Sequence, residues 1–483
     1  MAMRVLERKR EQTALTKDES HPNRTHWNPL TALSAVPLYL LAITFLARSS
    51  QNMGQTTFPI FGRDLFDMRS SMIGIMVAVG GLAGVASSIL IAAKVPTGRA
   101  TQSISIGQWL SAISFVFVAL PFSQWGLWAA SIILGVGGGL VFPGMMTATG
   151  RVERSKRGKA LAVYALILSA SLAVGPLVEA AVLDLVGGSL RVAFAALLPI
   201  PVAAAVIASW SGLRQSGRRR SVSSQERVVG PETEFISTST SELDINESRK
   251  REASTANMPT PTEMAETGGV IDLDKAVIPR SGVESFQGKR SFHLALVTSL
   301  TYQAPFIALI SFGGLLARHV DGLSQANVQL AFGLFFAVSF GIRAVIAAIS
   351  PIPSKAPFLA GAIAFTVAGI AVLGLGGGVG VLMIGMVLLG APHGAFFPLS
   401  TAILAEGSKA GELARSNARL VASISATSVI LPFICGWLVM SLGYRHMFLS
   451  LELPVVVFGL LVWSLYRRGA SDGIGRLAVG KAA

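Results

Sequence analysis

The chain has 483 residues, of which 52% are hydrophobic and only 14% are charged. A soluble domain of this length needs more charge on its surface, so the composition excludes a soluble protein and predicts one whose main solvent is the lipid bilayer. The formal net charge of +14 is spread over alternate loops rather than gathered on one face, and this distribution excludes a nucleic-acid partner.

About twelve apolar stretches, each long enough to cross a ~30 Å hydrocarbon core, follow one another along the chain. Their continuous apolar character predicts α-helices, because barrel strands would alternate and a lipid-exposed backbone must satisfy its own hydrogen bonds. The predicted spans are Ser34–Phe58, Met72–Ala92, Ile104–Leu120, Trp125–Thr147, Leu161–Leu183, Val192–Trp210, Phe292–Leu316, Val328–Ile349, Pro357–Leu375, Val381–Leu404, Leu420–Met440 and Met447–Tyr466.

Basic residues mark every second loop. They precede the first span at Arg8, Lys9 and Arg10 and follow the fourth span at Arg154 and Lys156, whereas the loops at 121–124 and 376–380 carry no Lys or Arg. Loops rich in Lys and Arg stay in the cytoplasm. We therefore expect a multi-pass protein of the plasma membrane or the bacterial inner membrane with both termini in the cytoplasm.

A polar segment rich in Ser, Thr, Glu, Arg and Pro divides the spans into two groups of six, and its composition cannot offset the entropy of an ordered chain. We predict a cytoplasmic tail at 1–29, a six-helix bundle at 30–212, a disordered cytoplasmic linker at 213–291, a second six-helix bundle at 292–468 and a cytoplasmic tail at 469–483.

The two groups share a pattern about 255 residues apart. The fourth span contains Leu134-Gly135, Gly139 and Phe142-Pro143, and the tenth contains Leu389-Gly390, Gly394 and Phe397-Pro398 in the same order. Such an internal repeat is typical of transporters built from two similar halves.

With this layout the chain resembles the major facilitator superfamily over everything except its tails and linker. Gly135 to Gly139 with Pro143 is similar to the family's fourth-helix motif, and Gly175-Pro176 to the core of its antiporter motif. The resemblance implies an all-α membrane protein with two pseudo-symmetric six-helix bundles. It also implies a monomeric secondary transporter that moves a small solute by alternating access, without a cofactor.

Charged groups at membrane depth are costly and mark candidate sites. Arg48 lies near the middle of the first span, and Arg48, Gln51, Asn52 and Gln55 follow the spacing of one helix face. In the resembled fold the first, fourth, seventh and tenth helices line the substrate cavity. The resemblance therefore implies that Tyr302, Gln303 and His393 also face the substrate.

Four further residues are candidates for coupling or gating, namely Gly175, Pro176, Glu179 and Arg343. Gly341-Ile342-Arg343 resembles the eighth-helix arginine of carboxylate-transporting relatives. Each charged candidate also has a structural interpretation, in which Glu179 lies at the membrane interface, Arg343 extends to the cytoplasm and Arg48 pairs with a carboxylate or helix carbonyls.

An excess of positive charge without a carboxylate at the same depth favours an organic anion or acidic metabolite as the substrate, with protons as a candidate coupling ion. The apolar surroundings also suit efflux of an amphipathic, drug-like compound. A transporter-like receptor that signals through the long linker is the alternative from another class. No phosphate-binding loop, paired carboxylates or metal-ligand cluster is present, and Cys435 is the single cysteine, so we expect neither an enzyme nor a metal site.

Overall fold

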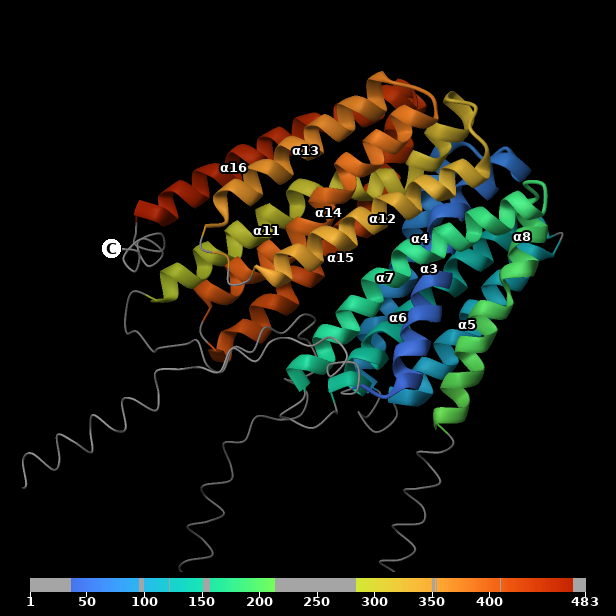
Figure 1. Ribbon diagram of the computed structural model, residues 1–483, viewed down its shortest axis with the longest axis horizontal. Coiled ribbons are helices and arrows are strands. Elements are labelled where there is room, and N and C mark those ends of the chain that lie inside the picture. The colour runs from blue at the N-terminus through green and yellow to red at the C-terminus, as the bar shows by residue number, and fades with distance from the viewer. Residues whose placement is uncertain are drawn as a thin grey trace, which may run out of the picture.

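The computed structural model describes residues 36–94, 100–120, 122–150, 157–212, 284–349, 352, 354–408 and 410–471. Within these ranges the chain forms helices and no strands, as the apolar spans predict (Figure 1). The predicted N-terminal tail, the linker up to residue 283 and the chain after residue 471 lie outside the described residues.

The first bundle contains α3 (Leu38–Phe66), α4 (Ser70–Lys94), α5 (Ala100–Ala119), α6 (Gln124–Gly150), α7 (Arg157–Leu185) and α8 (Leu190–Leu197), which opens the span Leu190–Gly212. The second bundle contains α11 (Glu284–Ala308), the π-helical turns η4 (Leu309–Gly313) and η5 (Leu316–Val320), α12 (Gln325–Ala348), α13 (Ala356–Leu375), α14 (Val379–Gly407), α15 (Ala410–Ser450) and α16 (Glu452–Ser471).

The number of membrane-spanning helices agrees with the prediction. The described residues hold 10 helical stretches that are long and apolar enough to cross a membrane. One of them, Arg415–Arg468, is divided by Gly443, whose positive φ of 79° interrupts the helix between the last two predicted spans. The helix α3, with 29 residues, is outside that set and occupies the position of the first predicted span. The seventh helix begins at Glu284, before its predicted start at Phe292.

The repeated glycines bring equivalent helices together in both bundles. In the first, Gly135 of α6 lies against the backbone of Gly80 in α4. In the second, Gly390 and Gly394 of α14 lie against the backbone oxygens of Phe335 and Ser339 in α12. A Cβ atom at these positions would meet backbone atoms, so glycine is what permits the close approach. The sequence repeat therefore corresponds to a structural repeat.

The two bundles meet at one end and diverge toward the other (Figure 1). Helix α7 contacts α12, and α4 contacts α15. At the α4–α15 crossing, Gly74 faces the backbone of Pro432 and Gly436, and the Ser70 and Tyr444 hydroxyl groups are 3.0 Å apart.

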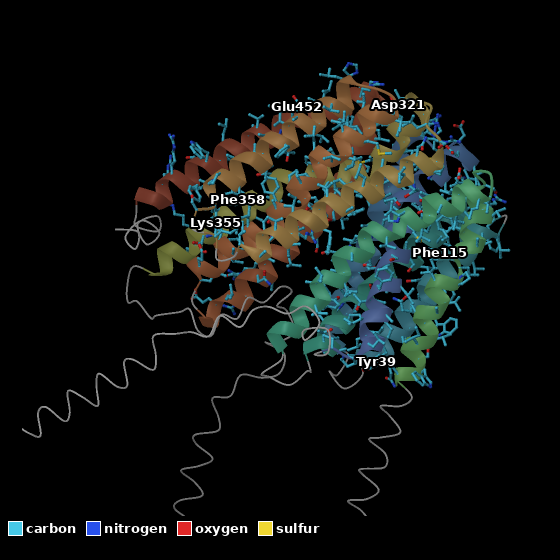
Figure 2. All side chains as sticks on the ribbon, in the orientation of Figure 1. Tyr39, Phe115, Asp321, Lys355, Phe358 and Glu452 are labelled. Carbon is cyan, nitrogen blue, oxygen red and sulfur yellow. The ribbon has the colours of Figure 1, made fainter. Side chains whose placement is uncertain are left out.

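Ion pairs at the contact end join the bundles beyond the membrane spans. Asp64, after the apolar part of α3, accepts from Arg318 Nε at 3.1 Å and lies 2.8 Å from His319 Nε2. Figure 2 shows Asp321 at this contact end, whereas Tyr39 and Lys355 lie at the separated ends of the two bundles. Helix α3 begins, and the span Leu190–Gly212 ends, at the separated end of the first bundle (Figure 1 and Figure 2). The contact end lies at the opposite side of the protein.

Candidate functional site

The polar stripe of α3 divides into residues with different surroundings. Arg48 is half-buried, and its Nη1 lies 3.4 Å from Gln51 Oε1. Asn52 is buried and donates to the Leu172 carbonyl of α7 at 2.7 Å, so it joins two helices of one bundle. Gln55 is exposed. Asn52 is thus the member of the stripe whose polar group is used within the bundle, whereas Arg48, Gln51 and Gln55 have polar atoms that remain available to a ligand.

Gly175 and Pro176 lie where α7 approaches α3 most closely. A Cβ atom at Gly175 would stand 2.8 Å from the Ser49 carbonyl oxygen, and Ser49 Oγ donates to the Ser171 carbonyl at 3.1 Å. Pro176 lies inside α7. This glycine permits the α3–α7 contact that holds Asn52 in place.

Arg343 of α12 reaches across to the first bundle. Its Nη1 donates to Ser169 Oγ of α7 at 3.2 Å, and its Nη2 lies 3.4 Å from the carbonyl oxygen of His393 in α14. Arg343 is half-buried rather than extended into water. It therefore connects α12, α14 and α7 across the interface between the bundles.

Arg48 and Arg343 come from opposite bundles, and Arg343 also contacts the backbone of His393. The Nε atoms of both arginines and Nε2 of Gln51 are buried without a hydrogen-bond partner in the described structure. The ion pairs of the described residues involve Arg63, Arg318, Lys355 and Arg445, and His319 contacts Asp64, but neither of these two arginines takes part. We call Arg48, Arg343 and Gln51 the cationic cluster.

Aromatic rings surround His393 beside the cationic cluster. The ring of Phe306 is stacked on the imidazole with centroids 4.4 Å apart, and those of Phe335 and Phe336 lie at 5.1 and 5.7 Å. His393 Nδ1 is 2.8 Å from Ser339 Oγ. The second polar atom of the imidazole ring is Nε2. Among the three phenylalanine rings, that of Phe306 is only partly buried, so part of its surface is exposed.

Tyr302 and Gln303 use their polar groups within the second bundle. The Tyr302 hydroxyl donates to the Leu389 carbonyl of α14 at 2.6 Å, and its ring lies 5.9 Å from that of His393. Gln303 Nε2 donates to Ser428 Oγ of α15 at 3.0 Å. Both side chains position α11 against its neighbours, and Tyr302 also forms part of the aromatic group around His393.

Glu179 is completely buried in α7 and accepts a hydrogen bond from Thr57 of α3. Thr57 in turn accepts from Gln329 Nε2 of α12 at 2.8 Å, and Thr56 donates to Gln329 Oε1 at 3.2 Å. The second carboxyl oxygen of Glu179, Oε2, has no partner among the described residues. A polar network thus crosses the bundle interface at a buried carboxyl group.

Three residues of these contacts are not predicted from the sequence, namely Thr57, Ser169 and Gln329. Gln329 had a usable signal, because a carboxamide within the apolar eighth span requires a buried partner. Thr57 and Ser169 had none, since small hydroxyl side chains usually bond to carbonyl oxygens of their own helix, as Thr44 does with Leu40 here.

No three His, Cys, Asp or Glu side chains of the described residues lie close enough together to hold a metal ion. The chemistry offered by the cationic cluster is instead the binding of an anion by charge-assisted hydrogen bonds, with an aromatic surface beside it. Glu179 offers a separate, buried site for a proton.

Comparison with known proteins gives one sequence family and many structures of the same fold. The model of the Major Facilitator Superfamily matches residues 1–151 and 40–379. No curated protein matches the chain.

A structure of a POT family transporter in complex with 5-aminolevulinic acid is similar with a TM-score of 0.62 and 12% identity, covering 89% of this chain and 96% of the other. The nucleoside transporter NupG gives 0.59 and 14%, covering 89% and 98%. A bacterial homologue of the human lysosomal transporter Spinster, in an inward-facing and unoccupied conformation, gives 0.61 and 12%, covering 90% and 98%. At these identities the likeness concerns the fold.

Proposed function

The chain belongs to the Major Facilitator Superfamily and is a multi-pass membrane transporter, and we propose that it carries a small organic anion by alternating access. The observation that carries this proposal is the cationic cluster: Arg48 and Arg343 come from opposite bundles, the Nε atom of each is buried without a hydrogen-bond partner, and neither forms an ion pair among the described residues. A cation at membrane depth is costly unless a counter-charge or polar groups solvate it. An anionic substrate supplies that counter-charge.

The origin of the two arginines links binding to movement. Arg48 belongs to the first bundle, and Arg343 belongs to the second. An anion held by both guanidinium groups joins the two bundles and offsets the repulsion between their charges. Binding therefore stabilises conformations in which the arginines approach each other, as a carrier that moves its bundles around a central substrate requires.

The orientation follows from the loop charges. With both termini in the cytoplasm of a plasma or bacterial inner membrane, the contact end of the bundles faces outward and the structure is inward-facing. Cysteines at Ser123 and Gly378, in a chain without Cys435, should then react with an impermeant thiol reagent from outside, and cysteines at Ser155 and Ser408 only from the cytoplasm. Labelling of Ser155 from outside would reverse the orientation.

Efflux of an amphipathic, drug-like compound is the second candidate, favoured by the aromatic rings of Tyr302, Phe306 and Phe336 around His393. Aromatic surfaces bind apolar and aromatic bodies without need of a carboxylate. The two candidates differ in whether removal of the negative charge from a ligand abolishes its binding.

Thermal stabilisation of the purified protein by small carboxylates, each paired with its own neutral amide, separates the two candidates. We expect at least one carboxylate to raise the unfolding temperature and its amide not to do so, because a ligand that binds only the folded protein stabilises it. Arg343→Gln should remove the shift. Arg467→Gln, which removes an arginine stacked on Trp463 at the end of α16, should leave it unchanged. Stabilisation by amides and amphipathic cations alone would favour the second candidate.

A further inference from the structure

We propose that Glu179 is the site at which this transporter binds its coupling proton, and that Gln329 of the opposite bundle seals this site when the bundles meet. The proposal rests on the proposed transport function, since it assigns the residue that would couple the anion to a proton gradient. It is carried by the network Glu179–Thr57–Gln329, which crosses the bundle interface.

The surroundings of Glu179 favour a neutral carboxylic acid over a carboxylate. The side chain is 0% exposed, and Thr57 provides its one hydrogen bond, to Oε1. Oε2 is buried and unpartnered in the described structure. A buried charge without a cation is far more costly than a buried neutral oxygen without a partner. Binding of a proton to the carboxylate forms one O–H bond and removes this charge, with no other change of bonds.

Among the described residues, no ionisable side chain forms an ion pair with Glu179. The groups that face it are Thr57 from α3 and Gln329 from α12 by way of Thr57. The ionisable side chains that the structure describes on the surrounding elements are Tyr39, Arg48, Arg63 and Asp64 on α3, Tyr164 and Asp184 on α7, Arg191 on α8, and Arg343 on α12.

Gln329 makes the protonation of Glu179 depend on conformation. Its amide group bonds to both Thr56 and Thr57 of the other bundle, so these bonds exist only while the bundles are in contact. When the bundles separate at this end, Gln329 moves away from Thr57, and the Glu179–Thr57 pair becomes accessible to water. Glu179 then exchanges protons with the water on that side, and closure of the interface over it favours the protonated form.

The consequence is a coupling rule. A charged Glu179 opposes closure of the contact end, and a protonated Glu179 permits it. Net transport that uses a proton gradient requires both forms of Glu179, whereas exchange of one loaded substrate for another requires only the protonated form.

The test compares Glu179→Gln with Asp184→Asn in proteoliposomes supplied with an anion that stabilises the wild-type protein. Asp184 is an exposed carboxylate on the same helix and serves as the matched control. Glu179→Gln should keep anion exchange within about twofold of the wild type and lose accumulation under an inward proton gradient. Asp184→Asn should keep both. Gradient-driven accumulation by Glu179→Gln at the wild-type level would overturn the proposal.

A chemical measurement tests the proton site without any transport substrate. The apolar reagent dicyclohexylcarbodiimide modifies protonated carboxyl groups in apolar surroundings, and the modified residue is identified by mass spectrometry. We expect Glu179 to be labelled in the purified wild-type protein, with labelling that falls at least fivefold as pH rises, and Asp184 to remain unlabelled. Absence of labelling at Glu179 at every pH would contradict the proposal.

Replacement of Gln329 tests its effect on the proton site while the carboxyl group of Glu179 stays in place. Gln329→Leu removes the amide that covers Thr57, and it should make carbodiimide labelling of Glu179 more sensitive to pH. If the wild-type protein shows no anion transport while Glu179 is labelled as expected, the proposed function fails and the proton site stands. If transport and exchange occur and Glu179→Gln changes neither, the proton site fails and the proposed function stands.

Discussion

Replacement of the two arginines, singly and together, gives the most quantitative test of the cationic cluster. Arg48 and Arg343 should each contribute a charge-assisted hydrogen bond to the anion, and such bonds contribute about 1.5–3 kcal/mol. Arg48→Gln and Arg343→Gln should therefore each weaken anion binding by about 12- to 140-fold. The neutral amide of the same ligand should bind all variants alike.

The losses of affinity should reflect lost contacts with the anion, because both arginines have only weak contacts within the protein. Among the described residues, Arg48 contacts Gln51 at 3.4 Å, and Arg343 contacts Ser169 at 3.2 Å and His393 at 3.4 Å. These contacts are near the limit of hydrogen bonding and contribute little. Lysine keeps the charge but not the planar fork, so Arg48→Lys should cost roughly 2- to 12-fold, the value of one lost neutral hydrogen bond.

The double variant distinguishes one shared anion from two separate sites. If both arginines hold the same negative group, the double replacement should lose less than the sum of the single losses, by roughly 0.5–3 kcal/mol. Isothermal titration calorimetry of the four proteins measures this coupling energy, with circular dichroism as the check on folding. Single variants that bind the anion within about twofold of wild type, or losses that are equal for anion and amide, would refute the reasoning.

Three further predictions concern the interface and the helix contacts. Gly74→Val introduces atoms against the backbone of α15, and this overpacking should destabilise contact between the bundles by about 1–3 kcal/mol. A cysteine at Thr56, which is buried at the interface, should then react with a thiol reagent at least five times faster, and unchanged labelling would contradict the packing. Burial lowers the pKa of His319 from 6.5, so contact between the bundles favours the neutral imidazole beside Asp64 and is weakened when the ring is protonated. Labelling of a cysteine at Thr56 should therefore increase as pH falls below 6.5, and His319→Gln should abolish this pH dependence. Asn52→Ala should lower the unfolding temperature and keep anion affinity within about twofold, since Asn52 bonds to α7; a large loss of affinity would instead make it a ligand-binding residue.

The fold could be predicted from the sequence because each span must be long, apolar and helical. The repeat of Gly135 and Gly390 also predicted two similar bundles, since close helix contacts need small residues at fixed positions. The helix ends were less predictable. Helix α3 continues past its predicted end at Phe58 to Phe66, because Pro59 does not end the helix and Ile60 and Phe61 beyond it are buried in the core.

The candidate site was predictable where a residue is unusual in itself and not where its role depends on a partner. Arg48, Arg343 and His393 stand out in apolar spans, and the structure places Arg343 Nη2 3.4 Å from the carbonyl oxygen of His393. The regular spacing of Asn52 with Arg48 did not indicate that Asn52 faces α7, because residues four positions apart on a helix differ enough in direction to meet different neighbours. The bonds of Gln329 depend on which ends of the bundles are in contact, and this is a property of the conformation.

The depth of Glu179 is a related case. Its position near the C-terminal end of the fifth span suits either an interfacial or a buried carboxyl group, and the sequence carries no signal that separates them. Burial follows from the contact of α7 with α12, which places Gln329 above Thr57. Packing between bundles, rather than distance along the helix, therefore determines its surroundings.

Counterflow in proteoliposomes measures whether a small organic anion crosses the membrane through this protein by alternating access. Vesicles are loaded with an excess of an unlabelled carboxylate that stabilises the purified protein, and a trace of the same radiolabelled anion is added outside. We predict transient accumulation of label above equilibrium for wild type, none for Arg343→Gln, and none when the neutral amide replaces the carboxylate on both sides. Equal accumulation of amide and carboxylate, or wild-type vesicles that behave like empty ones, would contradict the account.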